Sequence, residues 1–180
     1  MKKSETALLI IDMINHFQFA NGDDCFHHTQ SIVAPILQLK ERARQNQVPV
    51  IYINDHYNLW QADYLKIINF CLTPQNESYI SHIAPKEDDY FLIKPKHSAF
   101  YGTALNTLLH HLGAKKLIIT GIAGNICVLF TANDAYMREY TLCCPDDCIA
   151  SADQRDNAYA LTMMANVLKA DISSGNSLIF

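Results

Sequence analysis

The most informative segment of this chain spans residues 117–128 and reads Leu117-Ile118-Ile119-Thr120-Gly121-Ile122-Ala123-Gly124-Asn125-Ile126-Cys127-Val128. Its apolar run predicts a buried strand that ends at Gly121. Small residues then indicate a tight turn, and a stretch with helical character carries the thiol of Cys127 in its first turn. This order places backbone N–H groups and the positive end of a helix dipole beside the sulfur. We therefore expect the turn to lower the pKa of the thiol and to favour the reactive thiolate.

Apolar runs and helical patterns alternate along the rest of the chain. This alternation predicts an α/β fold with three layers, α/β/α, around a mostly parallel, Rossmann-like central sheet of about six strands. Gly113 is expected to end one helix and Asn125 to cap the start of another. We expect strands at residues 6–11, 49–53, 90–93, 116–120, 141–145 and 170–173. We expect helices at 30–47, 61–72, 103–112, 125–140 and 153–169, with a loop and some short helix at 73–89.

Composition and charge exclude several functional classes. The chain has 180 residues, of which 49% are hydrophobic and 18% charged, and this predicts a single globular domain over residues 1–180. A formal net charge of -4 offers no basic surface for nucleic acid. The apolar runs are too short to span a membrane, and the six cysteines are expected to be free thiols. We therefore expect a cytoplasmic protein that binds neither nucleic acid nor membranes.

Three reactive side chains follow different predicted strands at their carboxyl ends. Asp12 ends the first strand, Lys94 the third, and Cys127 follows the fourth. Parallel sheets bind ligands at this edge, so we expect the three to meet there. Taken singly, the aspartate suits a turn, the lysine a solvated position and the cysteine a core. Together, a carboxylate, an amine and a thiol form a set suited to nucleophilic hydrolysis.

Longer segments around these residues support the same interpretation. They are the strand ending at Asp12, Lys94-Pro95-Lys96-His97-Ser98-Ala99-Phe100-Tyr101-Gly102-Thr103, residues 121–128, Thr131-Ala132-Asn133-Asp134-Ala135 and Asp146-Asp147-Cys148. In this order they resemble the isochorismatase-like cysteine hydrolases, over about residues 6–172. The resemblance implies a small-molecule substrate, no cofactor and a homo-oligomer, either a dimer or a tetramer.

The resemblance also implies roles for individual residues. Cys127 would be the nucleophile, Asp12 the general base and Lys94 a cation between the two. A cis peptide bond between Ile122 and Ala123 would aim the N–H groups of Ala123 and Cys127 at an oxyanion. The implied reaction is hydrolysis of an amide-type or imide-type C–N bond through a thioester.

Some positions depart from the family or leave a choice open. Gly124 stands where many members carry threonine, which leaves the shape of the oxyanion turn open. Lys96 competes with Lys94 for the lysine role, but the strand register favours Lys94. Asp55 and His56 are adjacent, whereas nicotinamidases carry an Asp-x-His metal pair; neighbouring side chains on a strand point to opposite faces, so we expect no metal.

Residues near the same edge of the sheet are candidates for substrate binding. They follow the first three strands, and the resemblance supports several of them as walls of a pocket. We expect substrate contacts from Phe17, Asn54, Trp60 and Tyr101.

Other activities remain open alternatives. An isochorismatase-type vinyl ether hydrolase or a nicotinamidase would share the fold. A receiver-like signalling module would explain Asp12, Asp55 and the pair Lys94-Pro95, but not the thiol. A catalytically silent binding module is the remaining alternative, and the joint presence of the three reactive residues argues against it.

Overall fold

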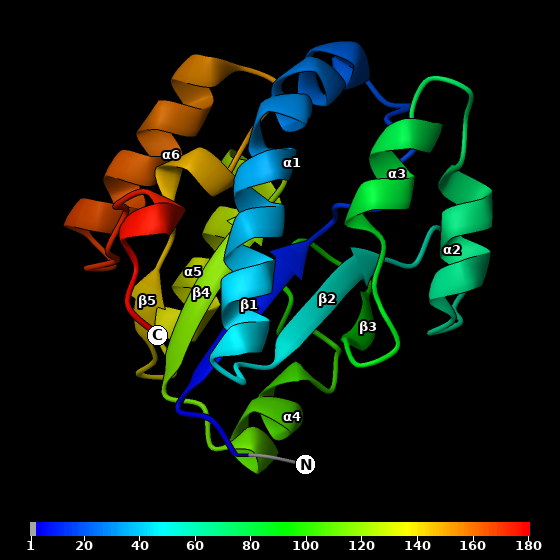
Figure 1. Ribbon diagram of the computed structural model, residues 1–180. Coiled ribbons are helices and arrows are strands. Elements are labelled where there is room, and N and C mark those ends of the chain that lie inside the picture. The colour runs from blue at the N-terminus through cyan, green and yellow to red at the C-terminus, as the bar shows by residue number, and fades with distance from the viewer. Residues whose placement is uncertain (1–2) are drawn as a thin grey trace.

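The computed structural model describes residues 3–180, so the first two residues of the expected domain lie outside it. A five-stranded, entirely parallel sheet runs through the molecule in the order β3-β2-β1-β4-β5 (Figure 1). Its strands are β1 (Thr6–Ile11), β2 (Val50–Asp55), β3 (Tyr90–Lys94), β4 (Lys116–Gly121) and β5 (Thr141–Cys143). The expected parallel sheet is confirmed.

Helices cover both faces of this sheet, which confirms the three layers. Side chains of β1 alternate between the two cores: Leu8 and Ile10 face one, Leu9 and Ile11 the other. The first core packs against α1 (Gly22–Gln45), α2 (Tyr64–Cys71) and α3 (Glu77–Ile83). The second packs against α4 (Leu105–Leu112), α5 (Leu129–Tyr136) and α6 (Gln154–Asn166). Within residues 3–180, none of the helices has the length and apolarity needed to cross a membrane.

Several element boundaries differ from the sequence-based expectation. Helix α1 begins at Gly22, well before the expected residue 30. Its first turn is polar, so the apolar pattern in the sequence does not reveal it, and Asp23 there is favourable at a helix N-terminus. The expected last strand is only an isolated bridge between Cys143 and Asp171. Asn125 caps no helix, because a π-helical turn already begins at Gly124. By contrast, α3 is the short helix expected within residues 73–89.

The topology places the functional edge near the middle of the sheet. From the central strand β1, the chain builds β2 and β3 on one side and β4 and β5 on the other. The crevice at such a reversal is the usual ligand site of open α/β sheets. Gly121 lets β4 approach β1 closely there: its φ is 112°, and a Cβ would lie 2.1 Å from the carbonyl oxygen of Ile11.

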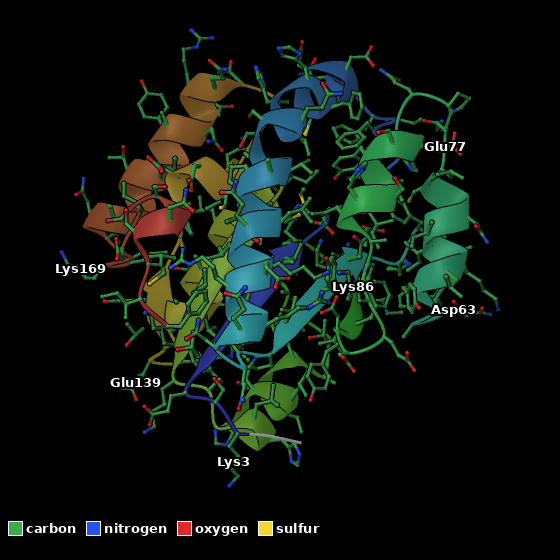
Figure 2. All side chains as sticks on the ribbon, viewed as in Figure 1. Lys3, Asp63, Glu77, Lys86, Glu139 and Lys169 are labelled. Carbon is green, nitrogen blue, oxygen red and sulfur yellow. The ribbon has the colours of Figure 1, made fainter. Side chains whose placement is uncertain are left out.

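A buried charge cluster fastens the segment before β3 to helix α1. Lys40 Nζ lies 2.7 Å from Asp89 Oδ2 and donates to the hydroxyl of Tyr52 at 2.7 Å, while Arg44 reaches Asp89 Oδ1 at 2.9 Å. Burial lowers the pKa of Lys40, and the charge of Asp89 opposes this effect. Other charged side chains, such as Lys169, stand at the periphery of the molecule (Figure 2). The cluster helps to set the start of the strand that ends at Lys94.

We predict that Asp89→Ala lowers the free energy of unfolding by about 3–5 kcal/mol, because it leaves a buried ammonium without its counter-charge. Urea unfolding followed by circular dichroism measures the change. Glu5→Ala is the matched control, since the pair between Glu5 and Lys115 is exposed and its loss should change little. Equal effects of the two substitutions would contradict the prediction.

Candidate active site

The ammonium group of Lys94 joins the three residues that the sequence singled out. Its Nζ lies 2.8 Å from Asp12 Oδ2 and donates to Cys127 Sγ at 3.4 Å. The carbonyl oxygen of Lys96 accepts a third hydrogen bond at 3.2 Å. The side chain of Lys94 is 2% exposed, so the charge depends on these partners. The structure therefore brings the predicted carboxylate, amine and thiol together.

The side chain of Lys94 crosses the edge of the sheet to make these contacts. Strand β3 lies two places from β1, which is a separation of about 10 Å. Asp55, at the end of the intervening β2, pairs with Lys94 in register. Its backbone N–H donates to Asp12 Oδ1 at 2.8 Å, so the two oxygens of Asp12 are held from two strands. Only a long side chain on β3 can reach over β2 to both partners.

The turn that carries Cys127 follows β4 and has the expected cis peptide bond between Ile122 and Ala123. Residues Gly124–Val128 form a π-helical turn, and the N–H of Val128 donates to the carbonyl oxygen of Ala123 at 3.1 Å. Ala123 and Cys127 line the same cavity as Asp12 and Lys94. Their roles as oxyanion donors stay a prediction.

Gly124 is needed in this turn because neighbouring side chains fill the space beside it. A Cβ there would lie 2.2 Å from Asn157 Oδ1, 2.7 Å from Ile149 Cγ2 and 3.0 Å from Ser151 Oγ. Ser151 Oγ donates to Asn157 Oδ1 at 2.8 Å and accepts the N–H of Asn125 at 3.1 Å. The serine and asparagine thus support the turn from the side where a threonine at 124 would stand.

The electrostatics of the thiol differ from the sequence-based expectation. Burial raises the pKa of Cys127, and the charge of Asp12 raises it further; the charge of Lys94 lowers it, but by less. Burial lowers the pKa of Lys94, but Asp12 and Cys127 outweigh this effect and the net shift is upward. Both upward pKa shifts favour a neutral thiol beside the ammonium group of Lys94 in the free protein. The expected lowering of the thiol pKa is wrong because local turn geometry says nothing of burial or of Asp12.

A cavity of about 500 Å³ opens over these residues. Its walls are mainly apolar and aromatic, with two imidazoles, and most of them lie within a few residues of a strand end. Sequence reasoning did not select most of these wall residues, although closeness to Asp12, Lys94 and Cys127 along the chain was a usable signal. Besides those three, the lining residues are Asn15, His16, Phe19, Cys25, Asp55, Tyr57, Pro95, Lys96, His97, Ile122, Ala123 and Ile126.

The four expected substrate contacts are not among the residues that line this cavity, and their contact with substrate stays a prediction. Phe17 is buried against the rings of Phe26 and Tyr79. Asn54 is buried, and its side-chain amide forms hydrogen bonds with the backbone of Ile14 in the segment after β1. Trp60 is exposed and stacks on an imidazole, and Tyr101 is exposed. The structure does not gather these four around the thiol.

The adjacent Asp55 and His56 are engaged with their own loop. Asp55 Oδ1 accepts the N–H of Tyr57 at 2.7 Å, and His56 Nδ1 accepts the N–H of Asn58 at 2.9 Å. Across residues 3–180, no group of three or more His, Cys, Asp or Glu side chains is arranged to hold a metal ion. The six cysteines are free thiols, as expected. A metal-free site stays a prediction.

A parallel α/β sheet at whose carboxyl edge one ammonium group contacts both a carboxylate and a thiol has the groups that nucleophilic hydrolysis uses. Residues 6–175 match the family model described as the isochorismatase domain. The chain therefore belongs to the isochorismatase family, whose members are hydrolases, including amidohydrolases.

Similar proteins span nearly the whole chain. It is 59% identical over 179 residues to the uncharacterized isochorismatase family protein YaaI of Bacillus subtilis (strain 168), covering 99% of both proteins. The crystal structure of N-carbamoylsarcosine amidase from Thermoplasma acidophilum is 27% identical with a TM-score of 0.73, covering 100% of each chain. The nicotinamidase SaPncA from Staphylococcus aureus is 25% identical with a TM-score of 0.73, covering 96% of this chain and 98% of that one.

We predict that Gly124→Ala lowers the free energy of unfolding by about 1–3 kcal/mol, as overpacking typically does. Urea unfolding measures the change. In a double-mutant cycle with Asn157→Ala, the two effects should sum to more than the effect of the double variant, since removing the amide oxygen relieves one of the contacts. Strict additivity would show that Gly124 and Asn157 do not compete for this space.

We predict opposite shifts in the pH dependence of Cys127 alkylation for two variants. Asp12→Asn removes the negative charge that raises the thiol pKa, so the midpoint should move to lower pH. Lys94→Gln removes the positive charge that lowers it, so the midpoint should move higher. Iodoacetamide rates followed by mass spectrometry give both midpoints, with Cys127→Ala as the blank. Shifts in the same direction would contradict this electrostatic account.

Proposed function

We propose that this hydrolase is a cysteine amidohydrolase, which cleaves an amide-type or imide-type C–N bond of a small molecule through a thioester on Cys127. One observation carries the proposal: the ammonium of Lys94 contacts both Asp12 and Cys127 beside a cavity of about 500 Å³. A nucleophile, a proton acceptor and a cation thus meet where a small carbonyl compound has room to bind.

The reaction begins with a proton transfer inside this group. The thiol of Cys127 gives its proton to the carboxylate of Asp12, and the thiolate attacks the carbonyl carbon of the substrate. The N–H groups of Ala123 and Cys127 then stabilise the oxyanion of the tetrahedral intermediate. Asp12 returns the proton to the leaving nitrogen as the C–N bond breaks. Asp12 next takes a proton from water, whose oxygen attacks the thioester carbonyl. Collapse of the second tetrahedral intermediate breaks the C–S bond and releases the acid, and Asp12 returns its proton to the departing thiolate of Cys127.

Burial favours this route because the first transfer leaves the total charge of the site unchanged. Before it, Asp12 is negative, Cys127 neutral and Lys94 positive; after it, the negative charge sits on sulfur instead. Lys94 contacts both positions at which the charge resides, so no new charge has to be buried. Loss of the thiol proton to bulk water would instead add a charge to the buried site.

Two similar solved structures support C–N cleavage, whereas a curated relative 30% identical over 167 residues, the isochorismatase of Bacillus subtilis (strain 168), represents the vinyl ether alternative. Two similar solved structures are an N-carbamoylsarcosine amidase and a nicotinamidase, and both names state an amidase activity. Cleavage of a vinyl ether needs no thiol nucleophile and would leave the contact between Lys94 and Cys127 without a chemical role. A silent binding module would likewise have no use for the three contacting groups. We further propose a cytoplasmic protein that works as a homo-oligomer, a dimer or a tetramer.

We predict that Cys127→Ala lowers kcat by about 10³-fold or more on any amide that the protein hydrolyses, because no other side chain replaces the nucleophile. The measurement is a hydrolysis screen over small amides, ureides and nicotinamide, with an isochorismate-type vinyl ether included. Quenched samples analysed by intact-protein mass spectrometry should show an acyl group on Cys127.

Cys143→Ala is the matched control, because this thiol is buried in β5 away from the cavity. It should keep both the activity and the acyl adduct. Full turnover of any substrate by Cys127→Ala would overturn the thioester route, and turnover of the vinyl ether alone would favour the alternative chemistry.

A further inference from the structure

One buried hydroxyl connects the nucleophile turn to the segment that follows Lys94. Thr131 lies in the first turn of α5 and is fully buried. Its Oγ1 donates to the carbonyl oxygen of Cys127 at 2.7 Å and accepts the backbone N–H of Ala99 at 2.9 Å. Thr131 thus touches the backbone of the nucleophile itself and, through the same oxygen, a segment from the other side of the sheet.

The segment held by Thr131 carries further parts of the site. Residues 95–103 follow β3 directly, and within them the carbonyl of Lys96 accepts from Lys94 Nζ while His97 lines the cavity. A second link lies one helical turn further on, where the hydroxyl of Ser98 hydrogen-bonds the carboxylate of Asp134. Displacement of this segment would therefore move one of the three acceptors around the ammonium group.

Such a link is needed because the sheet holds Lys94 and Cys127 only indirectly. Strand β3 lies three places from β4, a separation of about 14 Å, so no backbone hydrogen bond joins these two strands directly. Small changes in twist across three strand pairs would alter a contact of 3.4 Å between nitrogen and sulfur. The hydroxyl of Thr131 provides a direct link across the carboxyl edge of the sheet, because it hydrogen-bonds the backbone of both Cys127 and Ala99.

We propose that Thr131 is a positioning residue that sets the separation between the Lys94 ammonium and the Cys127 sulfur. This inference rests on the proposed function in that the separation matters for catalysis. Attraction between the two groups falls with distance and is strong only in a buried site. A looser segment would leave the thiolate less stabilised, while the cavity that binds substrate would keep most of its walls.

The chain offers closely matched variants for the test. Thr131→Val keeps the shape and removes both hydrogen bonds, whereas Thr131→Ser keeps the hydroxyl. Thr162→Val is the control: Thr162 makes the same type of bond, from Oγ1 to the carbonyl of Ala158 at 2.8 Å, but it is exposed on α6. Comparison of the three separates the cross-link from the ordinary bond between a threonine and its own helix.

We expect Thr131→Val to move the midpoint of Cys127 alkylation by iodoacetamide to higher pH, because Lys94 then stabilises the thiolate less. On an amide substrate its kcat should fall by about tenfold to hundredfold, with a smaller change in KM. Thr131→Ser should restore both values toward those of the wild type, and Thr162→Val should change neither. Thermal unfolding of each variant shows whether the fold is retained.

Two outcomes would overturn the inference: a wild-type midpoint in folded Thr131→Val, or a defect in Thr131→Ser as large as that in Thr131→Val. If Thr131→Val does not fold, Ser98→Ala loosens the same segment through its other link. Its midpoint should then rise, and an unchanged midpoint would count against the proposal. Failure of the proposed function is a separate result, namely no Cys127-dependent hydrolysis, because alkylation requires no substrate.

Discussion

The arrangement of this molecule depends on one buried cation, the ammonium group of Lys94. An unpaired charge in a buried site costs several kcal/mol, so the ammonium group is stable there only if each of its N–H groups has an acceptor. Its acceptors come from three separate segments: Asp12 after β1, Cys127 after β4, and the backbone of Lys96. The cation that the proposed reaction uses therefore also links these segments at the carboxyl edge of the sheet. Under that proposal, stability and catalysis depend on the same contacts.

The three segments can meet at this edge only if the backbone approaches closely on both sides of Cys127. Two glycines, Gly121 and Gly124, permit this approach for different physical reasons. Gly121 adopts a left-handed conformation and lies against the carbonyl of Ile11, so both its φ and its missing side chain are required. Gly124 is required for space alone, because Asn157 and Ser151 occupy the volume that a side chain would take. The turn that carries Cys127 is thus packed from β1 on one side and from α6 and the segment before it on the other.

Much of this could be predicted from the sequence, and the errors have a common cause. Apolar runs and helical spacing predict the layers correctly, since each element is a local pattern, and the strand ends place Asp12, Lys94 and Cys127 on one edge. The walls of the cavity are a different matter. Phe17 and Phe19 are neighbours of the same type, yet Phe17 turns into the core and Phe19 into the cavity. That choice follows from a positive φ at Phe17 and from the rings it meets, neither of which is a local pattern. The start of α1 is missed for a different reason, because the first turn of this helix is polar.

The thiol illustrates why a correct location does not guarantee a correct charge. From its position in the turn alone, Cys127 should ionise easily; in the folded protein, burial and the carboxylate of Asp12 keep it protonated. Both contributions come from segments distant in the sequence. In the proposed mechanism, the thiolate forms when the thiol proton moves to Asp12 in the presence of substrate. Slow labelling of Cys127 at neutral pH is therefore what an active site of this design predicts, and it is no sign of a silent protein. A more informative measure is how far the pKa of the Cys127 thiol shifts when the charge of Asp12 or of Lys94 is removed.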